Sequence, residues 1–294
     1  MSIIDTPYNT KNIVSCLLRE GVSTVIRYYN FSNSISFPEK RLTLPEAEML
    51  SQKGIDIGVV FQQKQNEAGD FNYQKGFSAG RRAYRYARDD INQPVGSGIY
   101  FSVDFDATKK EITTAIVPFF EGIRDAFLKE KSESIEYDIG VYGSGFTAET
   151  LKKADLISLV WLAMSSGFQG TKAAQKSGAF NLNQQYPSGN ICGIGVDYNH
   201  SNPDGRGIGT FRLPHVQQQF QLSNTITEKS QFKVIARNGL RVRRGPGVEF
   251  DVAGIVQKGT LLSVIKIEGQ WALVDIEGDG MADGYVFAGY LEKR

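Results

Sequence analysis

The feature that most constrains this chain of 294 residues is a regular alternation of short β-branched or aromatic runs with longer helical patterns. Eight runs within about the first 210 residues have the length and composition of strands. They are Ile3–Asp5, Thr24–Tyr29, Asp56–Gln62, Ile99–Asp106, Ile139–Tyr142, Leu159–Ala163, Asn181–Tyr186 and Gly195–Asn199. Helical patterns fill most of the gaps, whereas the Gly/Ser-rich stretch Ser165–Gly178 indicates a loop with little helix. A doubly wound sheet shows the same alternation, but polar residues at the strand ends favour an α/β fold of the (β/α)8 TIM-type barrel class.

The pattern changes after about residue 202. A Gln-rich stretch, Gln217–Gln221, leads into the polar stretch Ser223–Ser230, which is typical of a linker. Short strand patterns with turn signals and no helical period follow: Phe232–Ala236, Leu240–Val242, Val252–Val256, Leu261–Ile267, Trp271–Asp275 and Gly284–Phe287. The sequence therefore predicts a barrel over residues 1–215, a linker over 216–230 and a small all-β barrel over 231–294.

Composition excludes several classes of protein. The formal net charge of +1 argues against nucleic acid as a partner, because phosphate binding needs a basic face. No apolar run approaches the length of a membrane span, and the start, Met1–Asp5, lacks the basic and apolar regions of a signal peptide. The two cysteines, Cys16 and Cys192, fit neither a disulfide framework nor a zinc site, so we expect two reduced structural thiols.

Two carboxylates on one predicted strand are the strongest candidates for chemistry. Side chains alternate along a strand, so Asp104 and Asp106 would share a face with Tyr100 and Ser102. Their backbones would lie about 6.6 Å apart. Rotamers then allow carboxyl separations of about 5–9 Å, which cover both retaining and inverting glycosidases. Mutual repulsion and burial would raise one pKa, as a proton donor near neutral pH requires.

Other polar residues end the remaining predicted strands. Asp5 and Asp197 end the first and last strands, which are neighbours in a closed barrel, so both should face the same mouth. Four acids at one rim repel each other, so their presence there would be explained by a bound polyol or by a reaction. The candidate substrate-binding residues are Asp5, Arg27, Gln62, Tyr142, Trp161, Gln185 and Asp197. Apart from His200, no histidine adjoins this set, so we expect no metal and no cofactor.

Six short motifs resemble those of a known family: Ile4-Asp5, the run Tyr100–Asp106, Gly140-Val141-Tyr142-Gly143, Trp161-Leu162-Ala163, Gln185-Tyr186 and Gly195-Val196-Asp197-Tyr198-Asn199. About 210 residues resemble the glycoside-hydrolase-like barrels of an uncharacterised bacterial family related to the family-25 (Chalaropsis-type) lysozymes. Those lysozymes carry Asp-x-Glu on the central strand, with the Glu as general acid. The resemblance implies that Asp104 matches the Asp. Asp106 stands where the Glu would be, one methylene shorter.

The last 65 or so residues resemble bacterial SH3-like modules. The matching segments are Leu240–Gly247, Lys258-Gly259-Thr260, Trp271, Gly284-Tyr285-Val286 and Tyr290-Leu291. The resemblance implies a domain that tethers a hydrolase to the cell wall, although some such modules only brace the catalytic domain.

Together these patterns predict a peptidoglycan glycosidase of the muramidase type, with glycan strands as its partner, Asp106 as proton donor and Asp104 as charged partner. One alternative is a non-catalytic wall- or sugar-binding barrel. Another is an amidase or peptidase, which lacks a metal or nucleophile set here. Synthesis in the cytoplasm without a signal peptide implies release to the wall by a non-classical route. An antibacterial effector, with a possible immunity or secretion partner, and a lysin both fit that route.

Overall fold

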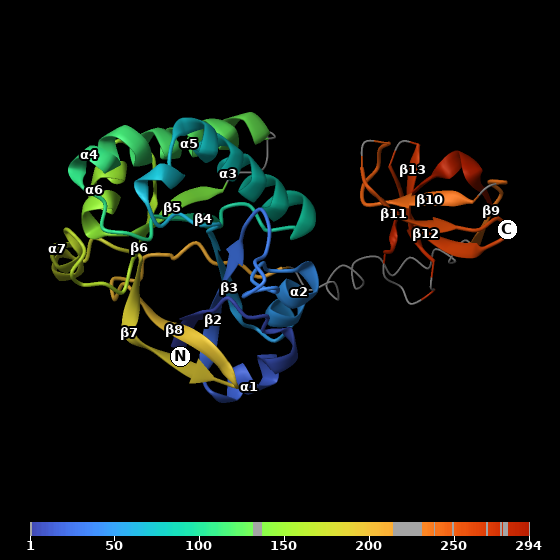
Figure 1. Ribbon diagram of the computed structural model, residues 1–294. Coiled ribbons are helices and arrows are strands. Elements are labelled where there is room, and N and C mark those ends of the chain that lie inside the picture. Colours follow the sequence, from blue (N-terminus) through green and yellow to red (C-terminus); the bar gives the residue numbers. More distant parts are fainter. Residues whose placement is uncertain are drawn as a thin grey trace. The chain divides into compact units, whose positions relative to one another are not determined.

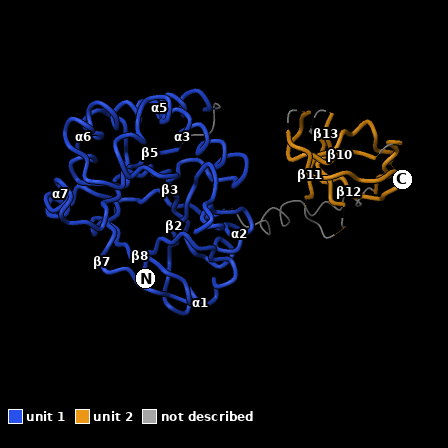
Figure 2. The backbone as a smooth tube through the Cα atoms, viewed as in Figure 1, with its two compact units in different colours: residues 1–216 blue, residues 217–294 orange. Residues whose placement is uncertain are grey.

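The computed structural model describes residues 2–131, 137–213, 231–237, 239–248, 250–268, 270–276, 278 and 282–293. The chain divides into two compact units, Met1–Val216 and Gln217–Arg294, coloured separately in Figure 2. The whole of the predicted linker, 216–230, lies outside the described residues. No helix of the described residues is both long enough and apolar enough to span a membrane.

The first unit is built on a closed barrel of eight strands (Figure 1). The strands are β1 Ser2–Asp5, β2 Val22–Tyr29, β3 Asp56–Phe61, β4 Gly98–Ser102, β5 Asp138–Gly143, β6 Leu159–Leu162, β7 Leu182–Ile191 and β8 Ile194–Ser201. Neighbours from β1 to β7 are parallel, whereas β8 is antiparallel to both β7 and β1. The closed barrel is confirmed, but the expectation of a uniform (β/α)8 alternation is wrong at its last strand.

The reason lies in the connection between β7 and β8. Only Cys192 and Gly193 separate the two strands, and both have positive φ, 55° and 85°. A two-residue turn of this kind joins antiparallel strands, because a parallel strand needs a crossover of a dozen residues or more.

The fourth strand is shorter than its sequence pattern indicates. It ends at Ser102, and the amide of Asp104 donates to the carbonyl of Gln65, 2.8 Å away, outside the sheet. Asp104 and Asp106 therefore lie in the loop after β4, and the expected shared strand face is wrong.

Helices surround the barrel strands in Figure 1. They are α1 Val14–Arg19, α2 Leu44–Gln52, α3 Tyr73–Arg85, α4 Lys109–Glu111, α5 Val117–Glu130, α6 Gly145–Lys153 and α7 Thr171–Ser177. Short 3-10 turns occupy Lys11–Ile13 and Ala68–Asp70, and π-helical turns occupy Tyr86–Asp90 and Ile112–Ile116. The predicted loop Ser165–Gly178 thus contains one short helix, α7.

The two longest helices, α3 and α5, approach each other closely. A Cβ atom on Gly76 would lie 1.9 Å from the carbonyl oxygen of Phe119, and one on Gly122 would lie 2.2 Å from that of Tyr73. Both positions therefore require glycine.

Side chains fill the barrel interior. Its buried apolar residues are Ile26, Val60, Tyr100, Leu159, Trp161 and Leu182. Outward-facing strand residues such as Val25, Val59 and Phe101 belong to the larger core that includes the helices. Because the interior is packed, access is left at the barrel mouth, where the parallel strands end.

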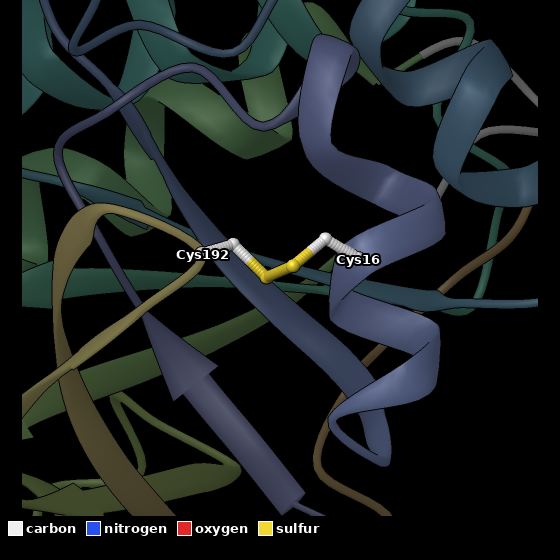
Figure 3. Close-up of a disulfide and its surroundings, with 2 residues drawn as sticks. All are labelled: Cys16 and Cys192. Carbon is white, nitrogen blue, oxygen red and sulfur yellow. A yellow bond between two sulfur atoms is a disulfide. The ribbon is translucent and has the colours of Figure 1, made fainter.

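A disulfide joins Cys16 on α1 to Cys192 in the β7–β8 turn (Figure 3). The expectation of two reduced thiols is wrong. The cysteines are 176 residues apart in sequence, but the fold brings the hairpin turn against α1, with a Cα–Cα distance of 6.1 Å.

The second unit is a seven-stranded antiparallel sheet in the order β11-β10-β14-β13-β12-β9-β15. Its elements are β9 Gln231–Val234, β10 Leu240–Arg243, β11 Val252–Val256, β12 Leu261–Glu268, β13 Trp271–Asp275, β14 Gly284–Phe287, a 3-10 turn Ala288–Tyr290 and β15 Leu291–Lys293. Val234, Val242, Ala272, Val274 and Val286 belong to its core. The all-β prediction is confirmed, with β15 as an additional short strand.

Replacing both cysteines by serine should lower the stability of the barrel by about 2–4 kcal/mol, because the disulfide restricts a long loop in the unfolded chain. Urea denaturation of Cys16→Ser/Cys192→Ser beside the natural protein would measure the change. Adding reductant should shift the natural protein toward the variant and leave the variant unchanged. An identical midpoint for oxidised natural protein and variant would contradict this expectation.

Candidate functional site

A small polar cavity of about 100 Å³ lies at the mouth of the barrel. Its lining residues are Asp5, Tyr28, Val60, Gln62, Ser102, Asp104, Tyr142, Trp161, Gln184 and Asp197. They come from the ends of parallel strands, from the loops that follow them and from the antiparallel hairpin β7–β8. The volume is below the roughly 300–1,000 Å³ of typical ligand pockets, so a ligand larger than a few atoms would extend over the mouth.

Two carboxylates face each other at the junction of β1 and β8. Asp5 and Asp197 are directly paired residues on these antiparallel strands. The side-chain amide of Gln184 donates to both, at 3.0 Å from Asp5 Oδ2 and 3.1 Å from Asp197 Oδ2. Asn199 Nδ2 also donates to Asp5 Oδ2, at 2.8 Å, and Ser188 donates to Asp197 Oδ1. The pair is therefore held together by one shared amide donor, Gln184.

Burial raises the pKa of Asp5 to about 7. The hydrogen bond from Asn199 opposes this shift, the charge of Asp197 adds to it, and hydrogen bonds from Gln184 and Tyr28 oppose it. Removal from water outweighs these donors because the carboxyl is only 2% exposed. Near neutral pH, Asp5 thus exists in both protonation states.

A third carboxylate, Asp104, enters the cavity from the loop after β4. Gln62 Nε2 donates to its Oδ2 at 3.2 Å. Partial burial raises the pKa of Asp104; the Gln62 hydrogen bond and the charge of Lys40 lower it, and the charge of Asp197 raises it. The Asp104 side chain remains exposed, so a ligand at the mouth can reach it.

Lys40 contacts two residues that line the cavity, Gln62 and Tyr28. Its ammonium group donates to Gln62 Oε1 at 3.1 Å and lies 4.4 Å from the centre of the Tyr28 ring. Burial lowers the pKa of Lys40 to about 8, although the charge of Asp104 opposes the shift.

Aromatic donors orient the two amides. The Tyr142 hydroxyl donates to Gln184 Oε1 at 2.7 Å, and Trp161 Nε1 donates to Asn199 Oδ1 at 2.8 Å. Each amide oxygen is thus occupied, so each NH₂ group faces the carboxylates. The rings of Tyr142 and Trp161 pack edge to face, with centroids 4.7 Å apart.

The structure brings six of the candidate residues into the cavity: Asp5, Gln62, Asp104, Tyr142, Trp161 and Asp197. The expectation that Asp5 and Asp197 meet at the mouth is met, although β8 runs in the opposite direction to the one expected. Asp106 does not line the cavity. Its Oδ1 accepts the backbone N–H of Gln169 at 2.8 Å, which joins the loop after β4 to the loop before α7.

Arg27 points away from the barrel interior, because Ile26 and Tyr28 occupy the inward positions of β2. It is fully buried, with Nε 2.8 Å from Glu46 Oε1. It also donates to the carbonyls of Thr6 and Glu39 at 2.6 and 2.7 Å. Its contacts therefore hold the loops after β1 and β2, and the two-residue alternation of β2 was the sequence signal for this.

Gln185 also lies outside the cavity, and its neighbour Gln184 takes the expected place. Adjacent strand residues face opposite sides, so an error of one position reverses the assignment. Sequence reasoning also missed Tyr28, Lys40 and Asn199. Side-chain alternation places Tyr28 on the inward face with Ile26 and Asn199 on the inward face with Asp197, whereas nothing in the sequence alone places Lys40 near the mouth.

Within the described ranges, no three His, Cys, Asp or Glu side chains are grouped so as to hold a metal ion. His200 packs against Phe180, with ring centroids 5.7 Å apart, and does not line the cavity.

A closed barrel with a carboxylate-lined mouth is the architecture expected of a glycoside-hydrolase-like domain. The chain belongs to the family described as Rv2525c-like, glycoside hydrolase-like domain, which matches residues 15–241. The bacterial SH3 domain family matches residues 238–292. Both resemblances expected from the sequence are confirmed.

Two curated relatives are uncharacterised proteins of Bacillus subtilis (strain 168). YbfG is 32% identical over 159 residues, which are 52% of this chain and 22% of YbfG. FadG is 26% identical over 162 residues, which are 55% of this chain and 27% of FadG. The matched region thus spans about a quarter of the length of these relatives.

Solved structures show the same fold. The Tat-secreted protein Rv2525c of Mycobacterium tuberculosis, in complex with L-tartrate, has a TM-score of 0.58 and 21% identity, covering 71% of this chain and 98% of that one. An uncharacterised B. stearothermophilus protein has a TM-score of 0.50 and 16% identity, covering 69% and 97%. At these identities the likeness establishes the fold alone.

Arg27→Met should destabilise the barrel by about 3–5 kcal/mol, because it leaves the Glu46 carboxylate buried without its partner. Arg27→Met/Glu46→Leu should recover much of the loss, since it removes both charges. Lys153→Met, in the exposed pair with Glu149, is the control and should change stability by less than about 1 kcal/mol. Chemical denaturation measures all three. Equal stability of Arg27→Met and the natural protein would show that the buried pair is dispensable.

Asp5→Asn should change how stability depends on pH. The folded pKa of Asp5, about 7, exceeds its ordinary value of 3.8, so folding favours the protonated carboxyl. The stability that the protonated Asp5 carboxyl contributes to the fold is fully present below about pH 4 and is lost as pH rises to about 7. The stability of Asp5→Asn relative to the natural protein should therefore increase between about pH 4 and 7 and then level. Urea midpoints across this range measure the difference, and a constant difference would contradict the raised pKa.

Proposed function

We propose that the barrel binds and hydrolyses the glycan strands of peptidoglycan as a muramidase-like glycoside hydrolase, and that the SH3 domain holds it to the wall. The observation that carries the proposal is the meeting of Asp5, Asp104 and Asp197 in one cavity. Glycoside hydrolysis needs one protonated carboxyl and one carboxylate near the same bond. Burial raises the pKa of Asp5 to about 7 and also raises the pKa of Asp104, so it favours the protonated form of a carboxyl in this cavity.

Asp104 is the proton donor in this proposal. It is exposed at the mouth, where it can reach a glycosidic oxygen, and partial burial favours its protonated form. Its proton passes to the leaving oxygen as the glycosidic bond breaks. Asp197 then faces the positive charge that develops at the anomeric carbon. The oxygen of a water molecule bonds to that carbon, and the proton that the water loses returns to the Asp104 carboxylate. Asp5 holds Asp197 in place through their shared donor, Gln184.

Asp106 is the competing donor, because it stands where related lysozymes carry Glu. Its hydrogen bond to Gln169 and its place outside the cavity favour Asp104 instead. The disulfide also excludes Cys16 and Cys192 as nucleophiles while it is intact, so nothing in the site favours a cysteine peptidase.

The same disulfide supports a site of action outside the reducing cytosol, since such bonds persist in oxidising compartments. The wall is therefore the proposed location. Release by a non-classical route, and an immunity or secretion partner, stay predictions.

A second candidate is a non-catalytic barrel that binds wall glycan. The position of Asp106 favours it, because the residue that would supply the acid in the lysozymes is shorter here and bonded to a backbone amide. The cavity would then recognise sugar hydroxyls through charge-assisted hydrogen bonds to its carboxylates.

Asp104→Asn should lower wall hydrolysis by about 10²–10⁴-fold, the usual contribution of general acid catalysis. Asp106→Asn, a carboxylate two positions away, is the matched control and should retain most activity. Turbidity of purified wall, with mass analysis of the fragments, measures both and shows whether new reducing ends appear.

The reverse result, activity lost in Asp106→Asn and kept in Asp104→Asn, would make Asp106 the donor. Binding of wall fragments without any new reducing ends, in the natural protein and in Asp106→Glu, would establish the non-catalytic barrel instead. New amines in place of reducing ends would indicate an amidase.

A further inference from the structure

A second hollow, of about 340 Å³, lies at the rim of the barrel between the loop after β3 and the helix α3. Phe31, Gln63, Gln65, Gln74, Lys75 and Phe119 are among its lining residues. Its volume is within the range of small-ligand sites, unlike that of the mouth cavity. We propose that this hollow is a second saccharide subsite, which binds an N-acetylated sugar unit of the glycan whose neighbouring unit lies over the mouth cavity. The inference rests on the proposed glycan ligand.

The two sites are continuous along one short segment. Gln62 lines the mouth cavity, and the next three residues, 63–65, line the hollow. Three residues of extended chain reach at most about 11 Å, so both sites are within reach of linked sugar rings. The carbonyl of Gln65 also accepts the amide of Asp104 at 2.8 Å, which ties the hollow to the proposed proton donor.

Hydrogen bonds hold the walls of the hollow in place. Gln63 Oε1 accepts the backbone amides of Phe31 and Ser32 at 2.9 and 3.1 Å, which joins the loops after β2 and β3. Gln65 is buried with φ of 58°, and its Oε1 accepts the amides of Gln63 and Lys64 at 2.7 and 3.1 Å. The hollow is therefore formed before any ligand binds, which lowers the entropic cost of binding.

The chemistry of the walls fits a neutral N-acetylated sugar. Phe31 is 46% exposed, and its ring is set edge to face on Phe61 with centroids 5.2 Å apart, so it offers an apolar surface to a sugar ring. Buried Phe119 and Ala79 supply an apolar surface for an acetamido methyl group. Exposed Gln74 supplies a carboxamide for hydroxyl groups.

Of the three charged side chains that line the hollow, two have partners within the protein, and the third, Lys64, is exposed. Lys75 Nζ donates to the carbonyl of Gly69 at 2.5 Å, and Asp70 Oδ2 accepts the amide of Asn66 at 3.2 Å. Because most of the charge in the hollow is already satisfied, its free surface is mainly apolar and carboxamide, which suits a neutral saccharide.

Calorimetry with N-acetylglucosamine and its β-1,4-linked dimer and tetramer tests the subsite. The natural protein should bind the oligomers more tightly than the monomer. Phe31→Ala should weaken oligomer binding about tenfold, the effect of uncovering one aromatic contact. Gln74→Ala should weaken it less, in the same direction. Ile35→Ala, at a fully exposed apolar residue of the same loop, is the matched control and should change nothing.

The inference and the proposed function can fail separately. Oligomer affinity that depends on Phe31 and Gln74 would support the subsite even if no wall fragment is released. Unchanged oligomer affinity in both variants would overturn the subsite even if the wall is cleaved. Failure of the natural protein to bind any oligomer would also overturn it.

Discussion

The pairing of β8 with both β1 and β7 is the constraint on which the barrel mouth depends. β8 runs antiparallel to both neighbours, and its hydrogen bonds close the barrel. That pairing sets Asp197 opposite Asp5, and the hairpin brings Gln184 within hydrogen-bonding distance of both carboxylates. The disulfide between Cys16 and Cys192 then fixes the turn of the β7–β8 hairpin to α1 (Figure 3). The strand pairing that closes the sheet therefore also brings the residues of the site together.

Gathering three carboxylates in a small cavity costs solvation and repulsion, and the surrounding donors offset part of that cost. Gln184 and Asn199 are oriented by Tyr142 and Trp161, so their NH₂ groups face the acids. For Asp5 these donors do not fully compensate, and its pKa remains near 7. Structural stability alone does not explain such an arrangement, which supports the proposal that these carboxylates act on a ligand.

The rim around this cavity is held by a different set of buried polar contacts. Glu46 Oε1 accepts from the backbone amide and hydroxyl of Thr10 and from Arg27, each at 2.8 Å. The Gln63 and Gln65 side chains fix the neighbouring loops. A cavity of about 100 Å³ cannot enclose a sugar ring together with its neighbours, so glycan binding would depend on this rim. A rigid rim beside a small acidic cavity is consistent with a ligand that lies across the mouth.

The sequence by itself determined the number of barrel strands, the change to an all-β region and the presence of Asp5, Asp104 and Asp197 near strand ends. These features depend on local periodicity and composition, which each segment carries alone. The alternation of side chains along β2 could also be read from the sequence. It places Arg27 on the outward face and so would have removed it from the candidate site. The eight residues between the predicted strands Asn181–Tyr186 and Gly195–Asn199 are also too few for a parallel crossover, so the direction of β8 had a signal in the sequence. Only the tertiary structure decided the end of β4 at Ser102, the choice of Gln184 over Gln185 and the pairing of Cys16 with Cys192. Each of these depends on which backbone groups meet across the sheet, and such pairing between residues far apart in sequence leaves no periodic signal within either segment.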